Sequence, residues 1–246
     1  MSVIIRKEQM EAFDLLGLEG HLVDHLHKFA RNHIESIGNF SLRHFVRLGI
    51  QNAAGVGWTK RGPVEFFLEV MVMLGSEFLT DPQYPWAAAS LRRPMEEMAG
   101  ADRLHLEVMK YYDAVLGPGL CYEVEAIQRV LASEYGKDHP LSGMSEPEIF
   151  PLVEWAFPQK YVFVGPAAIG ALVKEAKHVC AQFGVAPTGL ALVTVTLFTF
   201  GHGCFSDPQY PWIAACMRMK GPTKETPLHR VFRKYLKEAL TNMEQG

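Results

Sequence analysis

Between residues 228 and 240 the chain places apolar residues at intervals of three and four, with basic residues in most of the gaps. This is the period of an α-helix that buries one face and exposes the other. Residues 104–116 show the same spacing. The pattern therefore predicts two amphipathic helices, one near the middle of the chain and one near its end.

Two further segments are almost wholly apolar. Residues 63–74 begin with Pro63, contain the helix formers Glu, Leu and Met, and are followed by Gly75, which is the punctuation of a helix. Residues 189–200 contain an alternating Val-Thr run that is typical of a strand, but they align with 63–74 and are followed by Gly201. We therefore expect two buried helices.

Prolines interrupt the pattern between residues 136 and 165. Four of them fall in this stretch, and a proline inside a helix removes a backbone hydrogen bond. We expect this segment to be a loop with short helical turns. The rest of the chain is expected to be all-α.

The clearest pattern is an internal repeat. Residues 75–92 read GSEFLTDPQYPWAAASLR and residues 201–218 read GHGCFSDPQYPWIAACMR, and the two agree at ten of eighteen positions without a gap. Average amino-acid usage gives about one match by chance. The repeat therefore predicts a tandem duplication with an offset of 126 residues.

Weaker matches extend the repeat on both sides, pairing residues 42–57 with 169–184 and residues 104–116 with 228–240. We expect two helical units, unit 1 at residues 1–118 and unit 2 at residues 119–246, packed as one body with pseudo-two-fold symmetry. The DPQYPW motif would be the hallmark of each unit.

The motif has a structural interpretation that needs no ligand. Aspartate is a good N-cap, proline is tolerated at the start of a helix, and tryptophan can place a large ring in the core. On this view both tryptophans are buried in equivalent surroundings. The structural residues are Asp81, Pro82, Pro85 and Trp86 in the first copy and Asp207, Pro208, Pro211 and Trp212 in the second.

A functional interpretation is the alternative. It makes the amide and phenol groups between the prolines exposed, so that the two corners form parts of a surface that binds a partner. The residues concerned are Gln83, Tyr84, Gln209 and Tyr210.

Candidate catalytic chemistry is sparse. His21 and His25 lie one helical turn apart with Asp24 between them, a spacing that can hold a metal, but a third ligand is missing and the zinc-protease signature is absent. Glu65 and Glu69 also lie one turn apart. No nucleophile elbow or phosphate-binding loop is present, so we predict no catalytic residues, no metal and no cofactor, with a metal-dependent enzyme using the His21/His25 region as the alternative.

Composition narrows the function classes. The 246 residues are 48% hydrophobic and 21% charged, enough apolar material for a sizeable core. A net charge of −3 argues against binding nucleic acid through overall charge. The chain begins without an apolar signal segment, and its longest apolar core, at 190–200, is too short to span a bilayer.

Four cysteines without paired spacing are expected to be reduced, buried thiols, so we predict a cytoplasmic protein. An excess of basic residues after residue 218 leaves binding to a membrane surface as a further alternative.

The residues IRKEQM at 5–10, then 42–50, then LGSEFLTDPQYPWA at 74–87 resemble a family of small bacterial proteins that are encoded beside type VI secretion effectors and spike-tip components and share an LGxxFxxDPxxPWA motif. The resemblance covers residues 4–116. It reaches unit 2 only through DPQYPW, where Cys204 stands in place of Phe78.

The resemblance implies a non-catalytic cytoplasmic binding protein. Its partner would be a protein, either a toxin or effector or a component of the secretion spike. Its role would be that of an adaptor or chaperone, or that of an immunity protein, and the resemblance carries over no catalytic residues.

Overall fold

A computed structural model describes residues 7–92, 95–132, 143–219 and 224–245. Every regular element in these ranges is a helix, so the all-α prediction is confirmed. Unit 1 contains α1 (Lys7–Phe29), α2 (Arg31–Ile37), α3 (Asn39–Gly55), α4 (Arg61–Leu74), α5 (Pro85–Leu91) and α6 (Glu97–Tyr111). A π-helical turn, η1 (Tyr112–Leu116), and a short 3-10 turn, η2 (Pro118–Leu120), follow α6.

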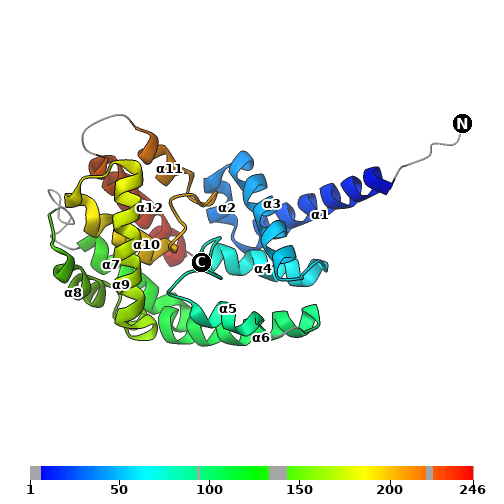
Figure 1. Ribbon diagram of the computed structural model, residues 1–246, viewed down its shortest axis with the longest axis horizontal. Coiled ribbons are helices and arrows are strands. Elements are labelled where there is room, and N and C mark those ends of the chain that lie inside the picture. The colour runs from blue at the N-terminus through cyan, green and yellow to red at the C-terminus, as the bar shows by residue number, and fades with distance from the viewer. Residues whose placement is uncertain (1–6, 93–94, 133–142, 220–223, 246) are drawn as a thin grey trace, which may run out of the picture.

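Unit 2 contains α7 (Cys121–Ala132), α8 (Glu146–Ala156), α9 (Pro158–Phe183), the 3-10 turn η4 (Pro187–Gly189), α10 (Leu190–Phe200), α11 (Pro211–Arg218) and α12 (Glu225–Gln245). Figure 1 shows α1 to α6 in one lobe and α7 to α12 in the other. The predicted helices at 63–74 and 189–200 correspond to α4 and to η4 with α10, and those at 104–116 and 228–240 to α6 with η1 and to α12.

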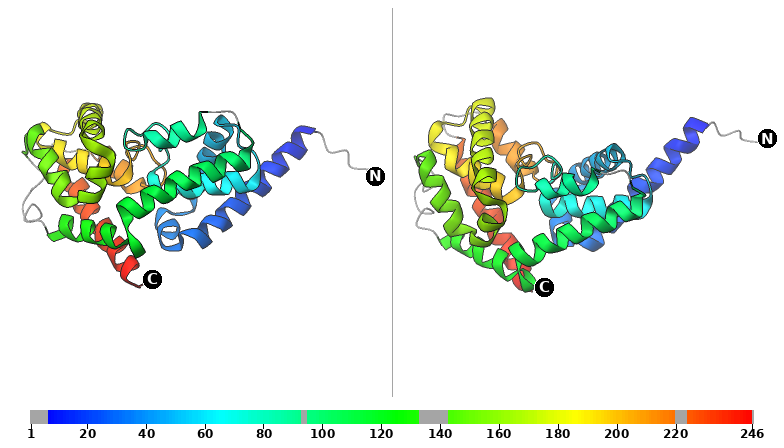
Figure 2. Two further views of the ribbon diagram at one scale, coloured as in Figure 1. Left: turned by 90° about the horizontal axis from the view of Figure 1, so that it is seen from below. Right: turned by 60° about the horizontal axis from the view of Figure 1, so that its bottom comes forward.

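Two hydrophobic clusters form the interior. One is built from buried residues between Leu22 and Val115, and the other from buried residues between Ala126 and Leu236. The gap between them lies where the sequence places the boundary between the units. Phe163 of α9 crosses this division, because it packs against the first cluster with its ring centroid 5.4 Å from that of Tyr111. The two views in Figure 2 show the lobes joined side by side.

The loop expected at residues 136–165 is wrong for its described part. Residues 133–142 lie outside the described ranges, but α8 and the first part of α9 occupy positions 146–165. Pro147 and Pro158 stand in the first turns of their helices, where a missing N–H costs nothing. Ser145 and Glu148 form a capping box that starts α8. Pro147 and Pro158 thus begin helices, and α8 also contains Pro151 in its interior.

The helix breaks in the two units match at an offset of 127. Ala30, between α1 and α2, has φ −141° and ψ 54°, and Phe157, between α8 and α9, has φ −131° and ψ 60°. Gly38, between α2 and α3, has φ 78° and ψ 153°, and Gly165, which kinks α9, has φ 77° and ψ 165°. A duplication would produce such parallels, and it stays a prediction.

Candidate functional site

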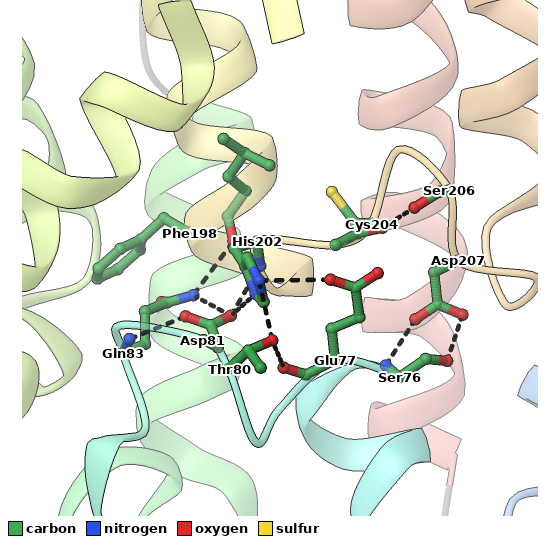
Figure 3. Close-up of polar contacts among 12 residues, drawn as sticks. Ser76, Glu77, Thr80, Asp81, Gln83, Phe198, His202, Cys204, Ser206 and Asp207 are labelled. Atoms are coloured by element: carbon green, nitrogen blue, oxygen red, sulfur yellow. Dashed lines mark hydrogen bonds and ion pairs between the residues drawn. The ribbon is translucent and has the colours of Figure 1, made fainter. Parts of the chain in front are cut away.

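The two DPQYPW corners meet between the lobes, and each aspartate binds the turn of the other unit. The Asp81 carboxylate accepts a hydrogen bond from the backbone N–H of His202 at 2.7 Å. The Asp207 carboxylate accepts one from the backbone N–H of Ser76, also at 2.7 Å, and another from the Ser76 hydroxyl at 2.8 Å. Figure 3 shows Asp81 beneath His202 and Asp207 beside Ser76. We call the segments 71–83 and 197–209, with these contacts, the central joint.

The glutamines of the motif repeat the exchange. Gln83 donates from Nε2 to the carbonyl oxygen of Leu197 at 3.3 Å, and Gln209 donates from Nε2 to that of Met71 at 2.8 Å. Met71 and Leu197 are 126 residues apart, as are the two glutamines. Each carbonyl also accepts the N–H of the glycine that follows its own helix, Gly75 for Met71 and Gly201 for Leu197, both at 2.9 Å. The glutamine amides therefore add a second donor, from the opposite unit, to each carbonyl.

Two glycines lie where the units come closest. Gly75 has φ 95° and Gly201 has φ 92°, a region that favours glycine. A Cβ atom on Gly75 would lie 2.9 Å from the Phe200 carbonyl oxygen, and one on Gly201 would lie 2.8 Å from the Leu74 carbonyl oxygen. The joint therefore needs glycine at both positions, for its backbone angles and for its lack of a side chain.

The exposure expected for the partner-binding residues is wrong. Gln83 and Tyr84 are 1% and 2% exposed, and Gln209 and Tyr210 are 0% and 6% exposed. The glutamines are covered by the opposite unit, and the tyrosines pack on aromatic rings of their own unit. In this fold they are not available to a partner.

The structural interpretation of the motif holds in part. Pro85 and Pro211 begin α5 and α11 as expected, each preceded by tyrosine at the N-cap. The aspartates are therefore not N-caps of these helices. Instead, Asp81 and Asp207 each accept the N–H of the residue two positions on, at 2.8 and 2.9 Å, which closes a tight turn over Pro82 and Pro208.

The tryptophans are half-buried, not buried, but their surroundings match. Trp86 lies 6.1 Å from Tyr111 between ring centroids at 35° between planes, and Trp212 lies 5.5 Å from Tyr235 at 31°. Tyr111 and Tyr235 are partners in the sequence repeat. Each corner therefore packs its tryptophan on the equivalent tyrosine of the following repeat segment.

A basic residue from the opposite unit reaches each corner, and the sequence analysis missed both. His33 of α2 contacts the second corner, where its Nε2 lies 3.1 Å from Gln209 Oε1. Lys160 of α9 contacts the first corner, where its Nζ lies 5.7 Å from the Tyr84 ring centroid and donates to the carbonyl oxygen of Phe198. His33 and Lys160 are 127 residues apart, so extending the repeat upstream of residue 42 would have paired them.

Burial shapes the ionisation of these groups. It lowers the pKa of Lys160 to about 8, although the charges of Glu123 and Asp81 act in the opposite direction. Burial also raises the pKa of Asp207, against the effect of its hydrogen bonds from Gln209 and Ser76. The joint thus holds an ammonium and a carboxylate that are both costly to keep charged.

The histidine pair on α1 faces the glutamate pair on α4. His21 Nε2 is hydrogen-bonded to Glu65 Oε1, and His25 Nε2 lies 2.8 Å from Glu69 Oε1. The two one-turn spacings that the sequence shows separately are therefore one helix–helix contact. Within the described ranges, no group of three or more His, Cys, Asp or Glu side chains is placed to hold a metal ion.

Cys180, Cys204 and Cys216 are buried free thiols as expected, whereas Cys121 is exposed. None of the helices that the structure describes is long and apolar enough to cross a membrane.

Unit 1 exposes apolar side chains on α4 and α6. Leu106 is 62% exposed, and Met73, Met98 and Met109 are also exposed. A Cβ on Gly62 of α4 would lie 4.0 Å from the Met98 sulfur, and Phe66 of α4 lies 5.7 Å from His105 of α6 between ring centroids. The two helices therefore run side by side in the same direction along this surface, which we call the α4–α6 face.

Comparison with known proteins gives no relative. No family model, no curated protein and no solved structure matches the chain.

Proposed function

We propose that the chain is a non-catalytic cytoplasmic binding protein that acts on a type VI secretion effector, as an adaptor or chaperone or as an immunity protein. The resemblance carried by LGSEFLTDPQYPWA at 74–87 supports the association. The α4–α6 face is the observation that carries the proposal, because it lies in the part of the chain that the resemblance covers. The buried DPQYPW corners then hold the two units together and do not bind the partner.

Helical geometry places several of the side chains at this surface on one side of each helix. Met98, His105 and Met109 follow one another at spacings of seven and four on α6, so they share a side of that helix. Phe66 and Met73 are seven apart on the adjacent helix α4. Contiguous exposed apolar surface marks sites of protein–protein contact, and methionine adapts its shape to a partner.

Unit 2 lacks this surface at the corresponding positions. In the repeat alignment Leu106 and Met109 of α6 pair with Arg230 and Arg233 of α12. Arg230 is exposed, and Arg233 donates to the carbonyl oxygen of Leu131. Unit 2 has arginine at both of these positions, so the packing of the units on each other does not require apolar residues there. This difference favours a function for the apolar side chains of unit 1.

The decisive experiment is a pull-down from the native cell with the tagged full chain and with a Leu106→Lys, Met109→Lys variant. We expect the wild-type chain to recover an effector or spike protein from the secretion cassette, and the variant to lose at least tenfold of it, since two desolvated anchors are replaced by charges. Val162→Lys is the matched control, because Val162 is an exposed apolar residue on α9. Recovery of no secretion-cassette protein by the wild-type chain would contradict the proposal.

Co-expression with the toxin of an adjacent gene separates the two roles. Rescue of growth together with binding indicates an immunity protein. Binding that increases soluble toxin without rescue indicates a chaperone or adaptor. The Leu106→Lys, Met109→Lys variant should lose either effect while keeping the thermal unfolding midpoint of the wild-type chain.

A further inference from the structure

One histidine lies in the central joint and another contacts it, and their neighbours favour opposite protonation states. His33 lies between Gln209 Oε1, 3.1 Å from its Nε2, and the Tyr235 hydroxyl, 3.1 Å from its Nδ1. The amide oxygen can only accept, so Nε2 carries the proton and donates. Nδ1 is then free to accept from Tyr235 in the neutral ring. A single neutral imidazole thus links α2, the second corner and α12.

The surroundings of His33 favour its neutral form. The Tyr210 ring lies 6.2 Å from the imidazole between centroids. Burial lowers the pKa of His33, and the contact with Gln209 and the charge of Asp207 only partly offset this. No carboxylate pairs directly with this ring among the ion pairs of the described residues.

His202 stands between two carboxylates instead. Its Nδ1 lies 3.3 Å from Asp81 Oδ2, and its Nε2 lies 3.4 Å from Glu77 Oε2. The Thr80 hydroxyl lies 3.3 Å from Nε2 as well. Figure 3 shows the ring placed between Glu77 and Asp81. Each nitrogen lies 3.3 or 3.4 Å from a carboxylate oxygen, so the doubly protonated, charged ring fits these neighbours better than the neutral ring.

The charges around His202 agree with this geometry. Burial lowers the pKa of His202, but contact with Asp81 and the charges of Asp81, Glu77 and Glu175 outweigh burial and raise the pKa above its usual value. The carboxylates come from the unit 1 turn and from α9, so they face the ring from both units.

We propose that the central joint is a pH-responsive clamp, which holds the two units most tightly when His33 is neutral and His202 is charged, and which loosens on either side of that window. The proposal concerns the joint alone and does not depend on the proposed function.

The pH dependence of the joint's stability has an acid limb, set by His33, and an alkaline limb, set by His202, and the direction of each follows from the pKa displacement. The folded pKa of His33 lies below the usual 6.5, so its contribution is complete above 6.5 and is lost as the pH falls toward the folded value. The folded pKa of His202 lies above 6.5, so its contribution is complete below 6.5 and is lost as the pH rises through the folded value. The clamp is therefore tightest near pH 6.5, the usual histidine value from which the two are displaced.

Amide hydrogen exchange of the full chain tests the clamp directly. The N–H groups of Ser76 and His202 each bond an aspartate of the opposite unit, so their exchange reports opening of the joint. After correction for base catalysis, we expect the opening equilibrium to rise on both sides of pH 6.5. Within each limb the change should approach about tenfold per pH unit, the slope for one proton.

Two variants assign the limbs. In His33→Gln the amide can still donate to Gln209 and accept from Tyr235 but cannot titrate, so the acid limb should disappear and the alkaline limb should remain. In His202→Gln the alkaline limb should disappear and the acid limb should remain. His44→Gln is the control, because His44 is exposed on α3, and it should leave both limbs unchanged.

A flat or one-sided profile of the wild-type chain would overturn the proposal, as would variants that leave their own limbs in place. Should either variant fail to fold, proton NMR titration of the wild-type imidazoles decides the question. One joint histidine must titrate below 6.5 and the other above it, and two ordinary titrations would overturn the proposal as well.

Discussion

The two DPQYPW corners share a sequence and a backbone hydrogen-bond pattern, yet they balance a buried carboxylate in different ways. Asp81 faces His202, which can carry a positive charge, at 3.3 Å. Asp207 accepts hydrogen bonds from the neutral groups of Ser76 and Gln209, and no ion pair of its carboxylate is found among the residues that the structure describes. The first corner therefore relies on charge and the second on hydrogen bonds. The same motif therefore accommodates a charged neighbour at one aspartate and neutral neighbours at the other, because both aspartates make the same hydrogen bonds to the backbone.

The glutamines differ in the same sense. Gln209 Oε1 lies 3.1 Å from His33 Nε2, whereas Gln83 Oε1 is buried with no donor among the described residues. Lys160 is the repeat equivalent of His33, but it donates to the carbonyl oxygen of Phe198 and not to Gln83 Oε1. The second corner is thus the more completely hydrogen-bonded of the two.

Replacing the glycine that precedes each corner should have the largest effect on stability. Gly75→Ala and Gly201→Ala each force a Cβ against a carbonyl oxygen at a positive φ. We expect each to lower the free energy of unfolding by about 3 kcal/mol or more, since overpacking and backbone strain add. Urea denaturation measures this.

Gly170→Ala is the control for these substitutions. Gly170 lies inside α9 with no atom within 4 Å of a Cβ position. It should leave stability unchanged or raise it by up to about 1 kcal/mol, as alanine does in a helix. Equal behaviour of all three variants would show that the units do not meet at Gly75 and Gly201.

Substitution of the two aspartates should lower stability by different amounts. Asp81→Asn strands the charge of His202 and is expected to cost about 3 kcal/mol, because breaking one side of a buried pair leaves the other uncompensated. Asp207→Asn should cost about 1 to 2 kcal/mol, since it loses a hydrogen bond but removes a buried charge. Urea denaturation at pH 6.5 compares them. Equal losses would mean that His202 does not neutralise Asp81.

Periodicity was sufficient to predict α6 and α12, and helix formers with a glycine end predicted α4, because these are local properties of the sequence. The strand-like run in α10 was assigned as helix only through its repeat partner α4. The helices at 146–165 were missed because proline counts against a helix in general but not in its first turn.

The contacts of the motif could not be read from the chain in the same way. Gln83 and Tyr84 were expected to be exposed only under the functional interpretation of the motif, and nothing within the six residues of the motif tells what lies opposite. That the opposite surface is the second copy follows only from the packing of the two units. His33 and Lys160 were different, since their pairing at an offset of 127 was present in the sequence.

The last effect depends on pH and concerns the basic residue at the first corner. Lys160 is buried and its pKa lies at about 8, below its usual 10.5, so the unfolded chain binds more protons between these values. The wild-type protein should therefore gain stability from Lys160 as the pH rises from about 8 to 10.5. Lys160→Met should abolish this gain, because it fills a similar volume without a charge.

The difference between the wild-type and Lys160→Met unfolding free energies, measured in urea at several pH values, isolates this effect from other titrations. We expect the difference to move in favour of the wild-type chain by up to about 3 kcal/mol between pH 8 and pH 10.5, following 1.36 kcal/mol for each unit of pKa displacement. Because His33 reaches the second corner as a neutral ring, His33→Gln should show no such change in this range. A difference that stays constant with pH would place the Lys160 ammonium in contact with solvent, and the first corner would then be no more dependent on charge than the second.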